Sequence, residues 1–69
     1  MKLSARNQFA GTVKKIVEGA VNSEVVIELA PGLEITAVVT KSSVERLGLR
    51  EGASAIAVIK ASNVMVGVE

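Results

Sequence analysis

Apolar and polar residues alternate most regularly in the middle of the chain, over residues 24–30 and 33–39. An apolar residue at nearly every second position is typical of a strand with one buried face. Between the two runs, Pro31 fixes its own φ and Gly32 can adopt a positive φ, which predicts a tight turn. The pattern therefore predicts a β-hairpin over residues 23–40.

Three further strands are predicted on either side of this hairpin. Residues 8–18 alternate less regularly, and we interpret Gly11 as the position of a bend or bulge in that strand. Residues 54–60 and 64–68 are rich in small and β-branched apolar residues, and turn residues at 61–63 separate them. With the hairpin, these runs make five strands.

One short helix is predicted over residues 40–48. Thr40 or Ser42 can act as its N-cap, Ser42 and Glu45 fit a capping box, and Gly48 is a natural stop. A helix after the third of five strands indicates a mainly all-β fold, a five-stranded OB-like barrel with one short helix. No repeat or linker interrupts the pattern, so residues 1–69 are expected to form a single domain.

Length and composition predict an oligomer. A chain of 69 residues has a marginal core, because a domain of this size buries only about 60% of its unfolded surface. Yet 49% of its residues are hydrophobic, and no cysteine is present to form a disulfide. We therefore expect the surplus apolar surface to be buried against other copies of the chain.

Several classes of function are disfavoured by what the chain lacks. Without histidine or cysteine, imidazole catalysis and thiolate metal sites are removed, so we expect neither an enzyme nor direct protein–metal ligands. A net charge of +1 and a single aromatic residue, Phe9, argue against nucleic-acid binding. No apolar run reaches the roughly 18 residues that a membrane span needs, and the N-terminus does not resemble a signal peptide. A cytoplasmic protein that does not enter the membrane is expected.

Three clusters combine hydroxyls or cations with turn backbone: Ser4–Asn7, Thr40–Ser43 and Lys60–Asn63. The start of the predicted helix offers free N–H groups that favour an anion. Arg6 and Lys60 add full positive charges, and burial of a lysine within an apolar strand is costly unless the ammonium meets an anion or reaches water. Since no aromatic platform accompanies the clusters, a small tetrahedral oxyanion is the simplest ligand.

A simpler interpretation exists for each cluster. Thr40 and Ser42 are most simply helix caps, and Ser43 a solvated residue of the first turn. Arg6 can be a solvated side chain, and Lys60 can extend from an edge strand to water and discourage edge pairing. The residues alone leave both interpretations open.

Three sequence motifs change this balance. Ser-Ala-Arg-Asn-Gln at 4–8, Gly-Ala-Val-Asn-Ser-Glu-Val at 19–25 and the run Ala-Val-Ile-Lys-Ala-Ser-Asn-Val-Met-Val-Gly-Val at 57–68 together resemble the molbindin family. Molbindins are single-domain molybdate-binding proteins. The resemblance implies an OB-like barrel assembled as a hexamer, a trimer of dimers, with molybdate or tungstate bound between subunits.

The resemblance also implies two sets of site residues. One subunit would give Ser4 and Arg6 to the oxyanion, and its neighbour would give the rest of the first set: Thr40, Ser43, Lys60, Ala61 and Ser62. A second oxyanion site is matched only by segment, to Gly19, Ala20, Val21 and Asn22.

The function that we expect is cytoplasmic storage and homeostasis of molybdate without a cofactor. Molybdate is fully deprotonated near neutral pH, so a site made only of donors suits it, whereas hydrogen phosphate also needs an acceptor. The alternatives are an OB-type nucleic-acid binder, a ligand-free assembly module and an enzyme acting on a phosphorylated metabolite.

Overall fold

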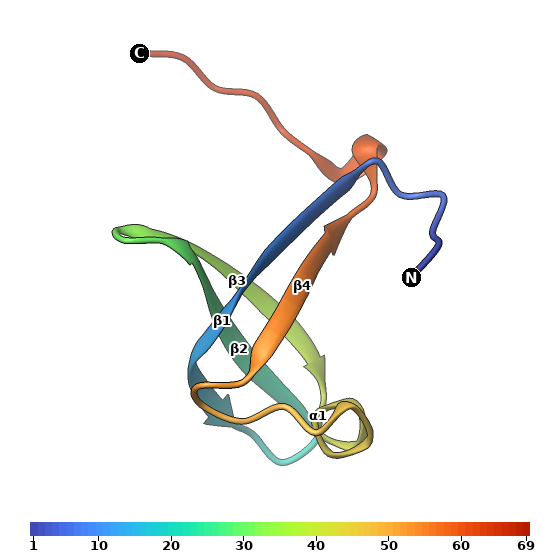
Figure 1. Ribbon diagram of the computed structural model, residues 1–69, viewed down its shortest axis with the longest axis vertical. Helices are drawn as coiled ribbons and strands as arrows, with labels where there is room; N and C mark the ends of the chain where they lie inside the picture. Colours follow the sequence, from blue (N-terminus) through green and yellow to red (C-terminus); the bar gives the residue numbers. More distant parts are fainter.

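The chain folds around one curled antiparallel sheet of four strands, shown in Figure 1 as a computed structural model that describes residues 1–69. The strand order in the sheet is β3-β2-β1-β4. The elements, in chain order, are β1 (Asn7–Glu18), β2 (Asn22–Ala30), β3 (Leu33–Thr40), α1 (Lys41–Leu47), β4 (Ser54–Ile59) and a 3₁₀ turn (Ala61–Asn63).

The predicted hairpin is confirmed. β2 and β3 pair antiparallel with Ile27 opposite Ile35, and Gly32 occupies the turn with a φ of 78°. The alternation in the sequence corresponds to the two faces of the hairpin, because Ser23, Val25 and Ile27 are buried while Glu24 is exposed and Val26 is only half-buried. The hairpin therefore presents one apolar face to the inside of the curled sheet.

The irregularity in β1 does not lie at the predicted glycine. Val13 pairs with Ile27 and Lys15 with Val26, so Lys14 is the extra residue of a β-bulge. Gly11 instead marks a close approach of two backbones, because a Cβ atom there would lie 2.5 Å from the carbonyl oxygen of Glu28. The prediction of a bulge at Gly11 was wrong because close approach and bulging both favour glycine.

The short helix is confirmed, but its predicted capping box is not. Thr40 is the N-cap, and its hydroxyl accepts a hydrogen bond from the backbone N–H of Ser43 at 3.1 Å. Gly48 ends α1 in the left-handed region with a φ of 66°. Because Thr40 caps the helix, Ser42 lies within its first turn and cannot form the predicted box with Glu45.

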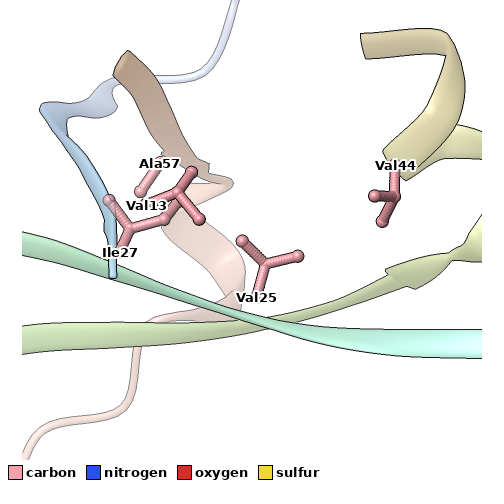
Figure 2. Close-up of a cluster of buried hydrophobic side chains, with 5 residues drawn as sticks. All are labelled: Val13, Val25, Ile27, Val44 and Ala57. Carbon is pink, nitrogen blue, oxygen red and sulfur yellow. The ribbon is translucent and has the colours of Figure 1, made fainter. Parts of the chain in front are cut away.

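The core is small and lies inside the curl of the sheet. It consists of five buried hydrophobic residues, which Figure 2 shows as sticks: Val13, Val25, Ile27, Val44 and Ala57. Val44 comes from α1 and approaches the others from one end, so the helix covers the end of the sheet where β2 starts and β3 finishes. All of these side chains are small or β-branched, and partly buried residues such as Leu29, Ile35 and Leu49 pack against them.

The sheet remains an open, curled sheet instead of a closed five-stranded barrel. Residues 64–68 form no strand, and this tail runs away from the sheet in Figure 1. The prediction of a fifth strand there is thus wrong for the single chain. A strand requires a neighbour for its backbone N–H and C=O groups, and the pattern of residues indicates strand character without indicating the partner.

Many large hydrophobic side chains remain on the surface of the single chain, among them Phe9, Val38, Ile56, Val58 and Met65. None of the helices is long and apolar enough to cross a bilayer.

Candidate functional site

A hollow at one end of the molecule brings the two ends of the chain together. It has a volume of about 660 Å³ and lies between the segment before β1 and the turn after β4. Its lining residues are Ser4, Ala5, Arg6, Val58, Lys60, Ala61, Ser62 and Asn63. Five of the predicted oxyanion residues therefore meet in one place although more than fifty positions separate the two groups in the sequence.

Strand pairing explains this meeting. β1 and β4 are antiparallel neighbours, and Asn7 at the start of β1 pairs with Ile59 at the end of β4. Arg6 and Lys60 are the next residue outward on each strand, so they flank the same end of the ladder. A side-chain bond from Asn7 Nδ2 to the carbonyl oxygen of Ile59, 3.2 Å long, strengthens this end.

The backbone on both sides of the hollow is held by short-range hydrogen bonds. Gln8 Nε2 donates to the Ala5 carbonyl at 3.0 Å, which fixes the segment that carries Arg6. In the 3₁₀ turn, the backbone N–H of Asn63 donates to the Lys60 carbonyl at 2.9 Å. The N–H groups of Ala61 and Ser62 begin this turn and are not used within it, so they are available to a ligand.

The charge of the hollow is wholly positive. The ion pairs of the molecule, formed by Lys14 with Glu28 and Glu34, lie elsewhere, and neither Arg6 nor Lys60 has a carboxylate within salt-bridge distance. No aspartate or glutamate lines the hollow. One guanidinium, one ammonium, two serine hydroxyls and free turn N–H groups thus converge without a compensating anion.

Lys60 reaches this position by a different route from the one predicted. β4 ends at Ile59, and Lys60 is an exposed residue that precedes the 3₁₀ turn. The argument that a buried lysine must meet an anion therefore does not apply within the single chain. The position of Lys60 beside Arg6 instead supports its assignment as an oxyanion-binding residue.

Thr40 and Ser43 lie at the other end of the molecule. They belong to the junction of β3 and α1, which is opposite the hollow along the long axis in Figure 1. Thr40 Oγ1 donates to Ser43 Oγ at 2.7 Å and lies 3.2 Å from Ser42 Oγ, so three hydroxyls form one cluster. Within one chain this cluster caps the helix and cannot reach the hollow.

The second predicted set lies beside this hydroxyl cluster. Asn22 pairs with Thr40 across β2 and β3, and the Val21 carbonyl accepts from the N–H of Lys41 at 2.8 Å. Gly19 cannot serve as a backbone donor here, because its N–H is bonded to the Asn22 carbonyl at 2.9 Å. The exposed turn from Gly19 to Asn22 and the hydroxyl cluster therefore form one continuous polar end.

The structure accordingly regroups the predicted residues. Lys60, Ala61 and Ser62 lie with Ser4 and Arg6 of the same chain, and the hydroxyl cluster lies with residues 19–22. The predicted division of the first set between two subunits stays a prediction. Of the lining residues, only Val58 lies outside the predicted clusters Ser4–Asn7 and Lys60–Asn63, and only the register of β1 and β4 could have indicated it.

Comparison with known proteins places this geometry in context. Residues 3–66 match the family described as the TOBE domain. Molybdenum-pterin-binding protein 1 of Clostridium pasteurianum is 47% identical over 66 residues, which are 96% of this chain and 97% of that protein.

Solved structures agree with the sequence comparison. The fold is similar to that of MopII from Clostridium pasteurianum, with a TM-score of 0.90, 45% identity and coverage of 97% of this chain and 100% of that one. It is also similar to the molybdate-bound form of the cytoplasmic molybdate-binding protein ModG. There the TM-score is 0.95 and the identity 61%, over all of this chain and 49% of that one.

Proposed function

Because the chain belongs to the TOBE-domain family, and within it to the molbindins, we propose that it binds molybdate at the hollow between β1 and β4. Tungstate, with the same shape and charge, would occupy the same site. The ligand is held by hydrogen bonds and charge, without direct bonds from protein atoms to the metal and without a further cofactor.

The observation that carries this proposal is the donor set of the hollow. Arg6 and Lys60 have no carboxylate partner, and the hydroxyls and turn N–H groups around them can all donate. A dianion without protons accepts at every oxygen, so each donor can be satisfied. Hydrogen phosphate would present its own proton to a lining that contains no carboxylate, which disfavours phosphate.

We place the completed site between subunits, but with Lys60, Ala61 and Ser62 on the same chain as Ser4 and Arg6, and not on its neighbour as the family resemblance implies. The hollow is open on one side, and a small tetrahedral ion needs donors around its whole surface. Thr40 and Ser43 would supply them from a neighbouring chain, because within one chain they lie at the opposite end of the molecule. The exposed hydrophobic residues of the single chain support an assembly, which we expect to be the hexameric trimer of dimers.

The proposed role is storage and homeostasis of molybdate in the cytoplasm. Binding of this kind needs no reacting group, and no group of three or more histidine, cysteine, aspartate or glutamate side chains gathers in the structure. A site shared by two chains would couple ligand binding to assembly, because an ion that binds only the assembled form stabilises it by mass action.

A second candidate ligand is a molybdenum-pterin, since relatives are named for binding it. A pterin ring is usually recognised by flat, apolar or aromatic surfaces, whereas the hollow has no aromatic side chain in its lining. The free oxyanion is therefore the better fit. Nucleic-acid binding is disfavoured for the same reason, because single strands stack on aromatic platforms.

The assignment of Arg6 and Lys60 can be tested by calorimetric titration with molybdate. Arg6→Ala and Lys60→Ala should each weaken binding by about 10- to 100-fold, since a charge-assisted hydrogen bond contributes roughly 1.5–3 kcal/mol. The matched control is Lys15→Ala, which removes an exposed lysine of β1 outside the hollow and should leave the affinity within about twofold.

The same titrations include sulfate, hydrogen phosphate and a reduced pterin without molybdenum. The donor set requires that hydrogen phosphate and the pterin do not compete with molybdate at equal concentration. Sulfate is also a dianion without protons, so its exclusion would require a completed site that fits the larger molybdate ion. Equal affinity of all three alanine variants for molybdate would show that the hollow is not the site.

A further inference from the structure

We propose that Asn7 is a positioning residue of the hollow, which fixes the separation of Arg6 and Lys60 and so favours molybdate over the smaller sulfate ion. The inference rests on the proposed function, because it concerns selectivity at the same site. Asn7 does not itself line the hollow, so it acts through the two cations.

A single side-chain hydrogen bond joins β1 to β4, and it is the bond from Asn7 Nδ2 to the carbonyl oxygen of Ile59. It links residues that are 52 positions apart in the sequence, at the last pair of the ladder. Asn7 is half-buried there, whereas Arg6 and Lys60, one residue further out, are exposed. The bond thus closes the end of the sheet at the point where the two cations leave it (Figure 1).

The acceptor of this bond determines the orientation of the peptide group that carries the Lys60 N–H. The Ile59 carbonyl and the Lys60 N–H belong to one planar trans peptide, in which the two groups point in opposite directions. A donor on the carbonyl side therefore fixes the N–H side as well. The 3₁₀ turn starts from this group, since the Asn63 N–H donates to the Lys60 carbonyl at 2.9 Å. The position of Lys60 thus depends on Asn7 through one rigid unit.

The segment that carries Arg6 is held from the other face of the sheet. Gln8 follows Asn7 in β1, so the two side chains point to opposite faces. Gln8 Nε2 donates to the Ala5 carbonyl at 3.0 Å, which is a local bond that does not reach β4. Gln8 therefore orders the chain before β1, and Asn7 is the side chain that ties this ordered segment to the strand that leads to Lys60.

Two like charges at the end of a ladder require such a restraint. Neither Arg6 nor Lys60 has a carboxylate partner, so the two groups repel each other in the empty hollow. Strand ends are also where a sheet opens most easily. A bound anion reverses the force, and a mobile pair of cations would contract onto a small ion as readily as onto a large one. The bond of Asn7 opposes both movements.

A fixed separation of the cations selects by size. Sulfate and molybdate are both dianions without protons, so the donor set alone does not distinguish them. A pair spaced for the larger ion leaves the smaller ion with longer and weaker hydrogen bonds. Preorganisation also removes the cost of ordering the cations when the larger ion binds. Asn7 would therefore contribute to affinity and to selectivity.

Displacement of bound molybdate by sulfate tests the selectivity. Asn7→Leu keeps a similar shape without a donor, and Asn7→Ala adds no apolar bulk. Each should lower the affinity for molybdate by about 3- to 10-fold in calorimetry, since one hydrogen bond is lost. At saturating molybdate, sulfate should displace the ion from both variants at a lower concentration than from the parent chain. An equal sulfate requirement, or no displacement from any of the chains, would overturn the proposal.

The matched control is Ala57→Gly, which weakens β4 at a buried position opposite Phe9 and outside the hollow. It should lower the melting temperature by roughly 4–8 °C and leave the sulfate requirement at the parent value. If Ala57→Gly loses selectivity to the same extent as the Asn7 variants, Asn7 acts only through the stability of the sheet and the proposal is wrong.

Backbone NMR relaxation of the ligand-free protein tests the positioning step apart from binding. The amides of Arg6 and Lys60 should have order parameters near about 0.85 in the parent chain and in Ala57→Gly, and below about 0.6 in Asn7→Leu. Equal rigidity in all three chains would overturn the proposal. If the parent chain does not bind molybdate at all, the proposed function is wrong, and the order parameters still decide whether Asn7 fixes the two cations.

Discussion

At the scale of one residue, Ser23 places an unpaired polar group in a very small core. Its side chain lies on β2 with only 2% of its surface exposed, and its hydroxyl has no hydrogen-bond partner in the chain. A buried hydroxyl without a partner costs roughly 1–3 kcal/mol. Beside five buried hydrophobic residues, such a cost is a substantial fraction of the stability of a small domain.

Ser23→Ala should therefore leave the free energy of unfolding unchanged or raise it by up to about 1 kcal/mol, because the unpaired hydroxyl is removed and the methylene remains buried. Chemical denaturation at a fixed chain concentration measures this. The control is Ser54→Ala, an exposed serine of β4 that should change the stability by less than about 0.5 kcal/mol. A loss of 1 kcal/mol or more in Ser23→Ala would show that the hydroxyl has a partner that the single chain lacks.

Thr40 has two proposed roles, helix cap and oxyanion ligand, and two substitutions separate them. Thr40→Asp retains a good N-cap but places a carboxylate where the oxyanion would bind. Thr40→Ala removes both the helix cap and the hydroxyl that would contact the oxyanion, and it should lower the free energy of unfolding by about 1 kcal/mol. If both roles hold, Thr40→Asp keeps the melting temperature and loses molybdate affinity in calorimetry.

The capping role alone would give a different pattern. In that case Thr40→Asp would bind molybdate as tightly as the parent chain, and Thr40→Ala would lose stability without losing affinity. This pattern would remove Thr40 from the proposed site while leaving the hollow at Arg6 and Lys60 intact.

At the scale of elements, the bulge in β1 has a visible consequence. The extra residue, Lys14, hydrogen-bonds to Glu34 of β3, and its Nζ lies 3.7 Å from Oε2 of Glu28 of β2. One bulged side chain thereby links three strands on the outer face of the sheet. The pKa of Lys14 is raised above its ordinary value of 10.5, first by the hydrogen bond to Glu34 and then by the charge of that carboxylate.

The raised pKa fixes the sign of a pH dependence. A folded-state pKa above the unfolded value adds stability that is complete below pH 10.5 and is lost as the pH rises through the folded value. The stability difference between the parent chain and Lys14→Met should therefore be constant at lower pH and shrink as the pH rises above 10.5 through the folded-state pKa. The effect is small because Lys14 is exposed.

Denaturation curves recorded for both chains across this range provide the measurement, with Lys15→Met as the control that carries no ion pair. If the difference in unfolding free energy stays constant with pH, or if the control shows the same change, the ion pairs of Lys14 do not stabilise the contact between β1 and the hairpin.

The elements that depend on local pattern were predictable, and those that depend on distant partners were not. The hairpin follows from alternation around Pro31–Gly32, and α1 follows from Thr40 and Gly48, because these signals lie within the elements themselves. The bulge at Lys14 depends on how β1 meets β2, and no residue in β1 alone specifies that register. Residues 64–68 have the alternation of a strand, but alternation does not indicate which segment would pair with them.

The candidate site shows the same division. The residue types around Arg6 and Lys60 were identifiable because cations and hydroxyls beside turns suit an anion, and the family resemblance selected among them. Their meeting depends on the pairing of Asn7 with Ile59, which is set by the whole sheet. The separation of Thr40 from Lys60 in one chain was not predictable, since it depends on the position of α1 at the opposite end.

At the scale of the whole molecule, the single chain is an incomplete unit. Only 6 of its 69 residues are buried, and one end carries cations while the other carries hydroxyls and turn backbone. Large hydrophobic side chains, among them Val66 and Met65, are exposed in the single chain. The proposed binding of molybdate between subunits depends on copies that bring the two polar ends together.

Native mass spectrometry of the parent chain, titrated with molybdate, sulfate and phosphate, tests the central claim most directly. We predict a hexamer that takes up molybdate in discrete steps while sulfate and phosphate at the same concentration add no mass, and that loses this uptake in Arg6→Ala. A single chain that carries molybdate without assembling, or a hexamer that takes up all three anions alike, would contradict a selective oxyanion site shared between chains.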